Sequence, residues 1–279
     1  MNKKFTVSSF QEFKEKGKKI SMLTAYDYPT AKILDDAGVH SILVGDSLGT
    51  VVLGYEDTIK VTIEDMIHHI KAVERATKRS FLIGDMPFLS YHTGINDSVK
   101  NAGRLVQEGG CKAIKLEGGE EFSENIEAII KAGIPVIGHL GYTPQSINIF
   151  GGHKAQGKTL EVARKIYKDA LALQRAGVFS IVLECVPYKV AGFIAKKLDI
   201  PVIGIGSGSH CDGQVLVTQD ALGLDEDFNP KHAKKYSNIG SLYKEIVSKY
   251  IDEVDKAVFP SLENSFIVDD EVIEALEND

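Results

Sequence analysis

The stretch Ser41-Ile42-Leu43-Val44-Gly45-Asp46-Ser47 is the one from which the fold can be worked out. Its run from Ile42 to Val44 is apolar at every position, which is typical of a strand buried on both faces in a parallel sheet. The run stops at a carboxylate. In barrels of alternating strands and helices, side chains at the carboxyl ends of the strands form the active site, so Asp46 and Ser47 occupy the place where chemistry is expected.

The same pattern recurs along the chain as a helix that ends at glycine, a brief turn, an apolar strand and a polar residue. Segments between the strands, such as 62–77, 97–108, 123–132 and 160–176, have helical periodicity. Alternating strands and helices predict a parallel sheet with right-handed crossovers, and eight units favour a closed (βα)8 TIM barrel over an open doubly wound sheet. Complete copies of the pattern cover 37–46, 109–117, 132–139 and 176–184, and further strands are expected at 20–24, 81–85, 200–206 and 215–217.

The two ends of the chain lie outside this repeat. Ser8 or Ser9, followed three residues later by Gln11 or Glu12, predicts a capping box and a short N-terminal helix. From about residue 229 the pattern predicts helices over 231–236 and 239–256 and an acidic amphipathic tail from Asp269. We therefore expect residues 1–279 to form a single barrel domain with a short N-terminal helix and a helical C-terminal extension.

Composition excludes several classes of function. The 279 residues contain 32 Lys and Arg against 39 Asp and Glu, and the net charge of −7 gives no electrostatic case for nucleic acid or an anionic membrane. No stretch predicts a signal peptide or a membrane span, so a cytoplasmic protein is expected. The cysteines lack C-x-x-C spacing, which argues against a disulfide framework or a structural zinc site and predicts reduced, packed thiols: Cys111, Cys185 and Cys211.

Five polar residues follow five consecutive predicted strands, and in a barrel they converge on one rim: Asp46, Asp85, Glu117, His139 and Glu184. Carboxylates held close together repel one another unless a cation lies among them. Oxygen ligands favour a hard divalent ion, and Mg2+ with retained waters suits such a group better than zinc. The sequence therefore predicts a magnesium site at this rim.

Less specific explanations exist for the same carboxylates. An aspartate directly after a strand often caps the next helix, which applies to Asp46 and Asp85. Glu184 lies between apolar Leu183 and the segment 185–187, an environment that desolvates the carboxylate and suits it to act as a general base. The alternative is a structural ion pair with a lysine of a neighbouring strand.

Lys115 and His139 have two interpretations each. Lys115 shares a strand face with Glu117 and points into the barrel, so it needs an anionic partner, either Glu117 or a substrate carboxylate. His139 is either a proton donor or a hydrogen-bonded histidine at a strand end. The loop 204–208 is a weak candidate for binding a phosphate or carboxylate on its N–H groups. Other histidines are expected in solvent or in loops: His68, His69, His92, His153 and His210.

Six sequence blocks together resemble the ketopantoate hydroxymethyltransferase (3-methyl-2-oxobutanoate hydroxymethyltransferase) family. The match runs in the family's order from about Phe10 to Phe266. The blocks are Asp46-Ser47-Leu48-Gly49, Gly84-Asp85-Met86-Pro87-Phe88, Ile114-Lys115-Leu116-Glu117-Gly118, Gly138-His139-Leu140-Gly141-Tyr142-Thr143-Pro144-Gln145, Leu183-Glu184-Cys185-Val186-Pro187 and Ile203-Gly204-Ile205-Gly206-Ser207-Gly208.

The resemblance implies an enzyme that transfers the one-carbon unit of 5,10-methylenetetrahydrofolate to 3-methyl-2-oxobutanoate through a Mg2+-stabilised enolate. The product is 2-dehydropantoate, and the reaction is the first step of pantothenate biosynthesis. One Mg2+ per subunit and a homodecamer are further implications. Carried over by position, the roles are metal binding by Asp46, Asp85 and Glu117, substrate binding by Asp46, Ser47, Asp85 and Lys115, proton abstraction by Glu184, and an active-site place for His139.

Two rival functions fit the residues alone. A related Mg2+ barrel could act on 2-oxo acids by C–C lyase or phosphonomutase chemistry, with similar carboxylates and no folate. A non-catalytic ligand-binding barrel is the other, although clustered acids without a metal would cost stability. Tyr142 and the loop 150–153 differ from the commonest forms of the family, so folate-side contacts are not assigned.

Overall fold

The computed structural model describes residues 4–152 and 154–279, in which eight parallel strands close into a barrel in sequence order. The predicted barrel is thus confirmed. The last strand begins before the expected residue 215, because Gly213 pairs with Ile20 and Ile203 although it has no apolar side chain to reveal it. The strands are β1 (Ile20–Thr24), β2 (Ser41–Val44), β3 (Phe81–Asp85), β4 (Ala113–Glu117), β5 (Val136–Gly141), β6 (Ser180–Glu184), β7 (Val202–Ile205) and β8 (Gly213–Leu216).

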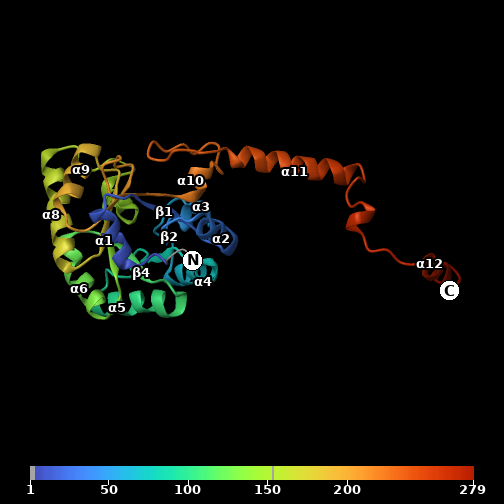
Figure 1. Ribbon diagram of the computed structural model, residues 1–279, viewed down its shortest axis with the longest axis horizontal. Coiled ribbons are helices and arrows are strands. Elements are labelled where there is room, and N and C mark those ends of the chain that lie inside the picture. Colours follow the sequence, from blue (N-terminus) through green and yellow to red (C-terminus); the bar gives the residue numbers. More distant parts are fainter. Residues whose placement is uncertain (1–3, 153) are drawn as a thin grey trace.

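Helices surround the outside of the barrel (Figure 1). Local signals define their ends: Thr62 caps one helix at the N–H of Asp65, and Gly38 ends another in the left-handed conformation, with φ of 85°. The helices are α2 (Tyr28–Ala37), α3 (Leu48–Val51), α4 (Ile63–Ala76), α5 (Ile95–Arg104), α6 (Ser123–Lys131), α7 (Ile147–Phe150), α8 (Leu160–Ala176), α9 (Tyr188–Lys197) and α10 (Thr218–Leu222), with a π-helical turn at Leu105–Gly109.

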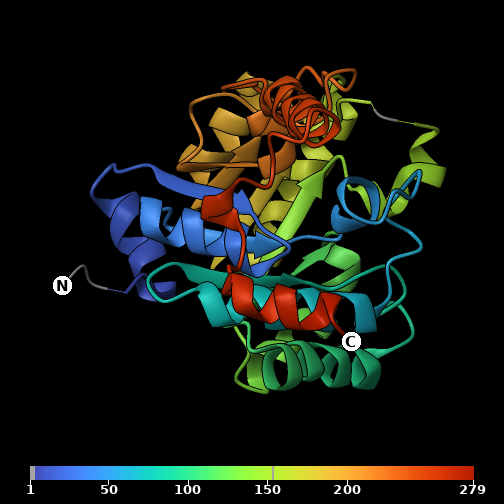
Figure 2. The same cartoon turned by 90° about the vertical axis from the view of Figure 1, so that its right-hand side faces the viewer.

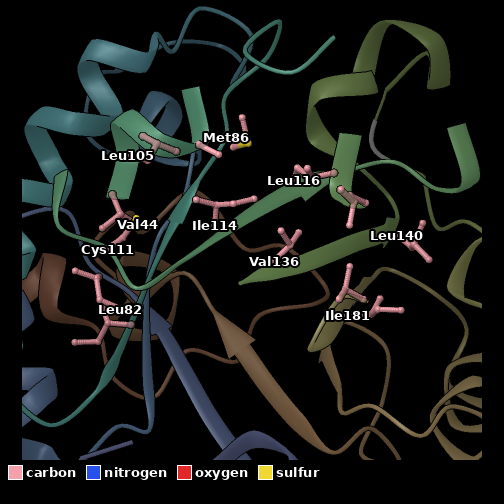
Figure 3. Packing of buried hydrophobic residues seen from close by; sticks show 14 of the residues in the cluster. Val44, Leu82, Met86, Leu105, Cys111, Ile114, Leu116, Val136, Leu140 and Ile181 are labelled. Atoms are coloured by element: carbon pink, nitrogen blue, oxygen red, sulfur yellow. The ribbon is translucent and has the colours of Figure 1, made fainter. Parts of the chain in front are cut away.

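Strand side chains alternate between two apolar cores. One set packs between the sheet and the helices and includes Leu82, Ile114 and Val136 (Figure 3). The other set, which includes Ile83 and Ile137, fills the barrel itself. Because successive side chains on a strand point to opposite faces, residues two positions after an inward residue also point inward. This parity directs Asp85, Lys115 and Glu117 into the barrel at the carboxyl ends of β3 and β4.

Helix α1 (Val7–Glu15) closes the amino end of the barrel. Phe10 is fully buried and makes edge-to-face contacts with Phe81 and Phe179. The expected capping box at Ser8 or Ser9 is wrong by two or three residues, since Thr6 is the N-cap and its backbone N–H donates to Ser9 Oγ over 3.1 Å. The opposite, carboxyl end of the barrel, where the polar residues are expected, is free of this helix.

The C-terminal extension is helical, as predicted, in α11 (Ile239–Asp255) and α12 (Asp270–Glu277), and it runs away from the barrel (Figure 1). Figure 2 views the molecule from the side of this extension. Its apolar side chains, among them Tyr243, Ile246 and Phe266, are exposed. Among residues 4–152 and 154–279, no helix combines the length and the apolarity needed to cross a membrane.

The helix predicted at 231–236 is not formed. Lys235 Nζ donates to the carbonyls of Asp225 and Glu226, and the Tyr236 N–H donates to the Ala221 carbonyl in α10. These non-helical bonds hold the segment as a loop, so helical composition is overridden by contacts outside the segment.

A candidate active site at the carboxyl ends of the strands

The register of β3 to β6 brings the predicted rim residues into contact. Asp85 pairs with Lys115 across β3 and β4, and Glu117 pairs with His139 across β4 and β5. Lys115 Nζ lies 2.9 Å from Asp85 Oδ2, and His139 Nδ1 lies 3.1 Å from Glu117 Oε1. On its other side, His139 Nε2 lies 3.3 Å from Glu184 Oε2. The predicted convergence of these side chains is confirmed.

Asp46 joins the group from the loop after β2. Its backbone N–H donates to Asp85 Oδ2 over 3.1 Å, and its Oδ2 accepts from Gln145 Nε2 over 2.8 Å. The helix-cap alternative is wrong for both aspartates, because α3 has Ser47 as its N-cap residue and the next helix after Asp85, α5, starts only at Ile95. Both carboxylates are buried and face the site.

Lys115 has its closest protein partner on the neighbouring strand. Of the two partners proposed from the sequence, Glu117 lies at 3.8 Å, farther than Asp85 at 2.9 Å. Burial alone would lower the pKa of Lys115, but the charges of Asp85, Glu117 and Asp46 outweigh it and raise that pKa. The ammonium is therefore charged.

His139 contacts charged side chains through both of its ring nitrogens. Burial and the charge of Lys115 lower the pKa of His139, so the ring is neutral. Its Nδ1 lies 3.2 Å from Lys115 Nζ, which can only donate, and 3.1 Å from Glu117 Oε1. Its Nε2 lies 3.3 Å from Oε2 of Glu184, whose side chain is 14% exposed. His139 therefore stands between two carboxylates and an ammonium.

The site holds more negative than positive charge. Burial raises the pKa of Asp46 and Asp85, and it raises the pKa of Glu117 to about 7. Within the described residues, Oδ1 of Asp85 is buried and has no hydrogen-bond partner. Such an orphaned carboxylate oxygen, beside two further carboxylates and a single lysine, fits a divalent cation.

The donor set suits magnesium held by few protein ligands. Asp46 and Asp85 each offer a carboxylate, whereas Glu117 is engaged by the Gln145 N–H at Oε2 and by His139 at Oε1. Among the described residues, no three His, Cys, Asp or Glu side chains are arranged as a ready-made metal cage. Mg2+ is usually bound by one or two carboxylates with waters and substrate completing the octahedron, so the two aspartates fit it.

Three further polar residues at the site were not predicted. Tyr26 is buried, and its hydroxyl lies 2.8 Å from Oγ of Ser47, which remains partly exposed at the mouth. Gln145 is also buried and donates to the carboxylates of Asp46 and Glu117. Tyr91 is buried too, and its hydroxyl accepts from the Glu117 backbone N–H. Gln145 lies only six positions after His139, so a polar side chain in the short loop after β5 was an available signal. Tyr26 and Tyr91 gave none.

Other candidates have packing roles. In the loop 204–208, an added Cβ at Gly206 would meet His232 at 2.6 Å and one at Gly208 would meet Tyr188 at 2.5 Å, so close packing accounts for these two glycines. His69 is half-buried, and its Nδ1 lies 2.7 Å from the Tyr26 carbonyl. His68 is exposed as expected, His153 lies outside the described residues, Cys111 and Cys211 are buried, and Cys185 is half-buried.

Solved structures share the barrel at low sequence identity. Phosphonopyruvate hydrolase, in a complex with oxalate and Mg++, superposes with a TM-score of 0.63 at 14% identity, over 93% of each chain. A 2,3-dimethylmalate lyase of the PEP mutase/isocitrate lyase superfamily gives 0.59 at 13% identity, over 98% of each chain. These likenesses show the fold alone.

Comparison of sequences is more specific. A 3-methyl-2-oxobutanoate hydroxymethyltransferase of Acetivibrio thermocellus is 69% identical over 277 residues, which are 99% of this chain and 98% of the relative. Its counterpart in Clostridium botulinum strain Langeland is 56% identical over 271 residues, 97% of this chain and 98% of the relative. Residues 4–262 match the family model described as ketopantoate hydroxymethyltransferase. With the barrel and its rim of carboxylates in place, the chain belongs to the ketopantoate hydroxymethyltransferase family.

Proposed function

We propose that this protein transfers the one-carbon unit of 5,10-methylenetetrahydrofolate to 3-methyl-2-oxobutanoate through an enolate and yields 2-dehydropantoate, the first step of pantothenate biosynthesis. The identity of 69% to a hydroxymethyltransferase supports the reaction class. The observation that carries the mechanism is the buried group of Asp46, Asp85 and Glu117 around Lys115, in which Asp85 Oδ1 has no partner among the described residues.

In this proposal, Asp46 and Asp85 hold one Mg2+ per subunit. Bound Mg2+ supplies Lewis-acid stabilisation of the negative charge that develops on the keto oxygen. Glu117 supports the site from beside it, since both of its oxygens already contact protein groups. This assignment narrows the metal group expected from the sequence to two direct ligands.

Glu184 is the proposed general base that removes the proton from C3 of the keto acid. His139 Nε2 lies 3.3 Å from Glu184 Oε2 and holds that carboxylate at the rim. Lys115 and Ser47 are proposed to bind the keto acid, Lys115 through its charge and Ser47 through a hydroxyl that Tyr26 orients. General-base catalysis of this kind contributes about 10²–10⁴-fold, and positioning of the two substrates supplies much of the rest.

Carbon–carbon bond formation completes the proposed reaction. C3 of the enolate bonds to the methylene carbon of the folate, both C–N bonds that join this carbon to N5 and N10 of the folate break, and water provides the hydroxyl of the new hydroxymethyl group. The proton taken from C3 and the second proton of that water go to the two folate nitrogens. The protein's part in this step is to hold the enolate and the folate in line and to return the proton from Glu184.

Self-association is also part of the proposal, with a homodecamer as the assembly. The family resemblance supports it, and so do the exposed apolar side chains along α11 and α12. Exposed apolar surface of this extent is typical of an interface between proteins.

Proton NMR of 3-methyl-2-oxobutanoate in D2O, with the purified protein and with or without Mg2+, tests the first half of the reaction. We expect the C3 proton signal to disappear only with metal. Adding 5,10-methylenetetrahydrofolate should then give 2-dehydropantoate. No exchange of the C3 proton with Mg2+, whether the folate is absent or present, would refute the mechanism. Carbon–carbon cleavage without folate would favour the lyase alternative.

A further inference from the structure

Tyr91 and Gln145 form a buried hydrogen-bonded chain beside the carboxylates. Both side chains are almost fully buried, and they come from the loop after β3 and the 3-10 turn Pro144–Ser146 after β5. The Tyr91 hydroxyl donates to Gln145 Oε1 over 2.8 Å and accepts from the Glu117 N–H over 3.2 Å. The chain therefore connects two loops to the strand that bears Glu117.

Gln145 uses each of its polar groups in this arrangement. Its Nε2 donates to Asp46 Oδ2 over 2.8 Å and to the Met86 carbonyl over 2.9 Å. Its backbone N–H donates to Glu117 Oε2 over 3.0 Å. One residue thus contacts two of the four acidic side chains in the site.

The orientation of the Gln145 amide is fixed by its neighbours. The Met86 carbonyl can only accept, so it requires Nε2, and the Tyr91 proton requires Oε1 because the tyrosine oxygen already accepts from Glu117. A flipped amide would place an oxygen against two acceptors, Asp46 and Met86. An amide and a phenol are costly to bury unless they are hydrogen-bonded. We therefore interpret this pair as orienting its hydrogen-bond partners rather than as filling space.

We propose that Gln145, oriented by Tyr91, is the positioning residue of the magnesium site: it holds Asp46 at one carboxylate oxygen and leaves the other for the ion. The inference rests on the proposed metal role of Asp46 and Asp85. A carboxylate fixed before the ion arrives loses less freedom on binding, and losing such a supporting partner typically weakens metal affinity about 10–100-fold.

The test uses Mn2+ as the probe and the full-length protein without substrate. Free Mn2+ is followed by electron paramagnetic resonance during titration of the wild type, Gln145→Met and Tyr91→Phe. We expect the dissociation constant to rise about 10–100-fold in both variants. Excess metal should recover part of the lost turnover, whereas a merely structural defect would not respond to metal.

Two matched variants control for loss of a tyrosine hydroxyl. Tyr26→Phe removes a buried hydroxyl from the same rim but on the Ser47 side, and Tyr167→Phe changes a half-buried ring that packs on Phe193 in the outer helices. Both should bind Mn2+ like the wild type. If Gln145→Met does not fold by circular dichroism, Tyr91→Phe decides alone.

The outcomes separate the two proposals. Tight Mn2+ binding by the wild type and by both test variants would overturn the positioning role and leave the proposed function standing. Absence of Mn2+ binding in the wild type would overturn the metal site itself, and this inference with it. Weakened binding confined to the two test variants supports the inference.

Discussion

Replacing Lys115 with methionine removes a buried positive charge and keeps most of the side-chain volume. The Nζ atom lies 2.9 Å from Asp85 Oδ2, which at an effective dielectric constant of about 20 corresponds to an attraction of about 6 kcal/mol. Protonation of Asp85 would reduce this loss, since burial already raises the pKa of Asp85. We therefore expect a loss of about 3–5 kcal/mol in the free energy of unfolding, typical of a broken buried pair.

Thermal unfolding followed by circular dichroism measures this change. At about 2–4 °C per kcal/mol for a chain of this size, the melting temperature of metal-free Lys115→Met should fall by roughly 6–20 °C. Mg2+ should restore part of the difference by compensating the carboxylates. The matched control is Lys165→Met, which breaks an ion pair of 2.7 Å to Asp169 with a 66% exposed lysine and should change the unfolding free energy by less than about 1 kcal/mol.

The reasoning fails if metal-free Lys115→Met melts with the wild type or with the Lys165 control. It also fails if Mg2+ leaves the gap between wild type and Lys115→Met unchanged. Either result would mean that the carboxylates are not held by the charge of Lys115.

Three further predictions test Glu184 as the base, the buried carboxyl group of Glu117 and the packing of Phe10 at the amino end of the barrel. Glu184→Gln should slow C3 proton exchange, followed by NMR, about 10²–10⁴-fold with Mn2+ affinity unchanged, and loss of metal binding would disprove its role as base. Without metal, the free energy of unfolding measured in urea should fall as pH rises from 4.5 to about 7, because Glu117 holds its proton more tightly in the folded than in the unfolded chain. Mg2+ should reduce this dependence on pH. A metal-free unfolding free energy that does not change over this range would contradict the raised pKa of Glu117. Phe10→Ala should cost about 3–5 kcal/mol in urea unfolding with kcat unchanged, since Phe10 lies at the end of the barrel opposite the site, so a fall in kcat without loss of stability would be inconsistent.

Much of the architecture was readable from local patterns. Helix α8 spans 160–176 as predicted, because its periodic face is bounded by the Thr159 cap and a left-handed Gly177. The strands were recognisable because both of their faces are buried, which gives uninterrupted apolar runs. Polar residues directly after those runs then identified the rim.

The contacts within the rim were beyond the reach of those patterns. Asp46 and Gln145 are 99 positions apart, and Tyr91 and Gln145 are 54 apart, with no period to connect them. Strand parity predicts Glu117 or a substrate as the partner of Lys115, whereas the register of β3 and β4 places Asp85 directly opposite it. The composition of 231–236 predicts a helix, whereas its bonds go from Lys235 to the carbonyls of Asp225 and Glu226 and from Tyr236 to α10.

The sequence by itself therefore determined the alternation of strands and helices, the closed barrel and the five polar residues at the ends of its strands, since each of these follows from hydrophobic period and chain order. Tertiary structure alone decided which of those residues touch. Strand register selects the pairs Asp85 with Lys115 and Glu117 with His139, and the loop after β5 folds back to place Gln145 between two carboxylates. Register and loop return depend on packing across the whole barrel, which no local stretch encodes.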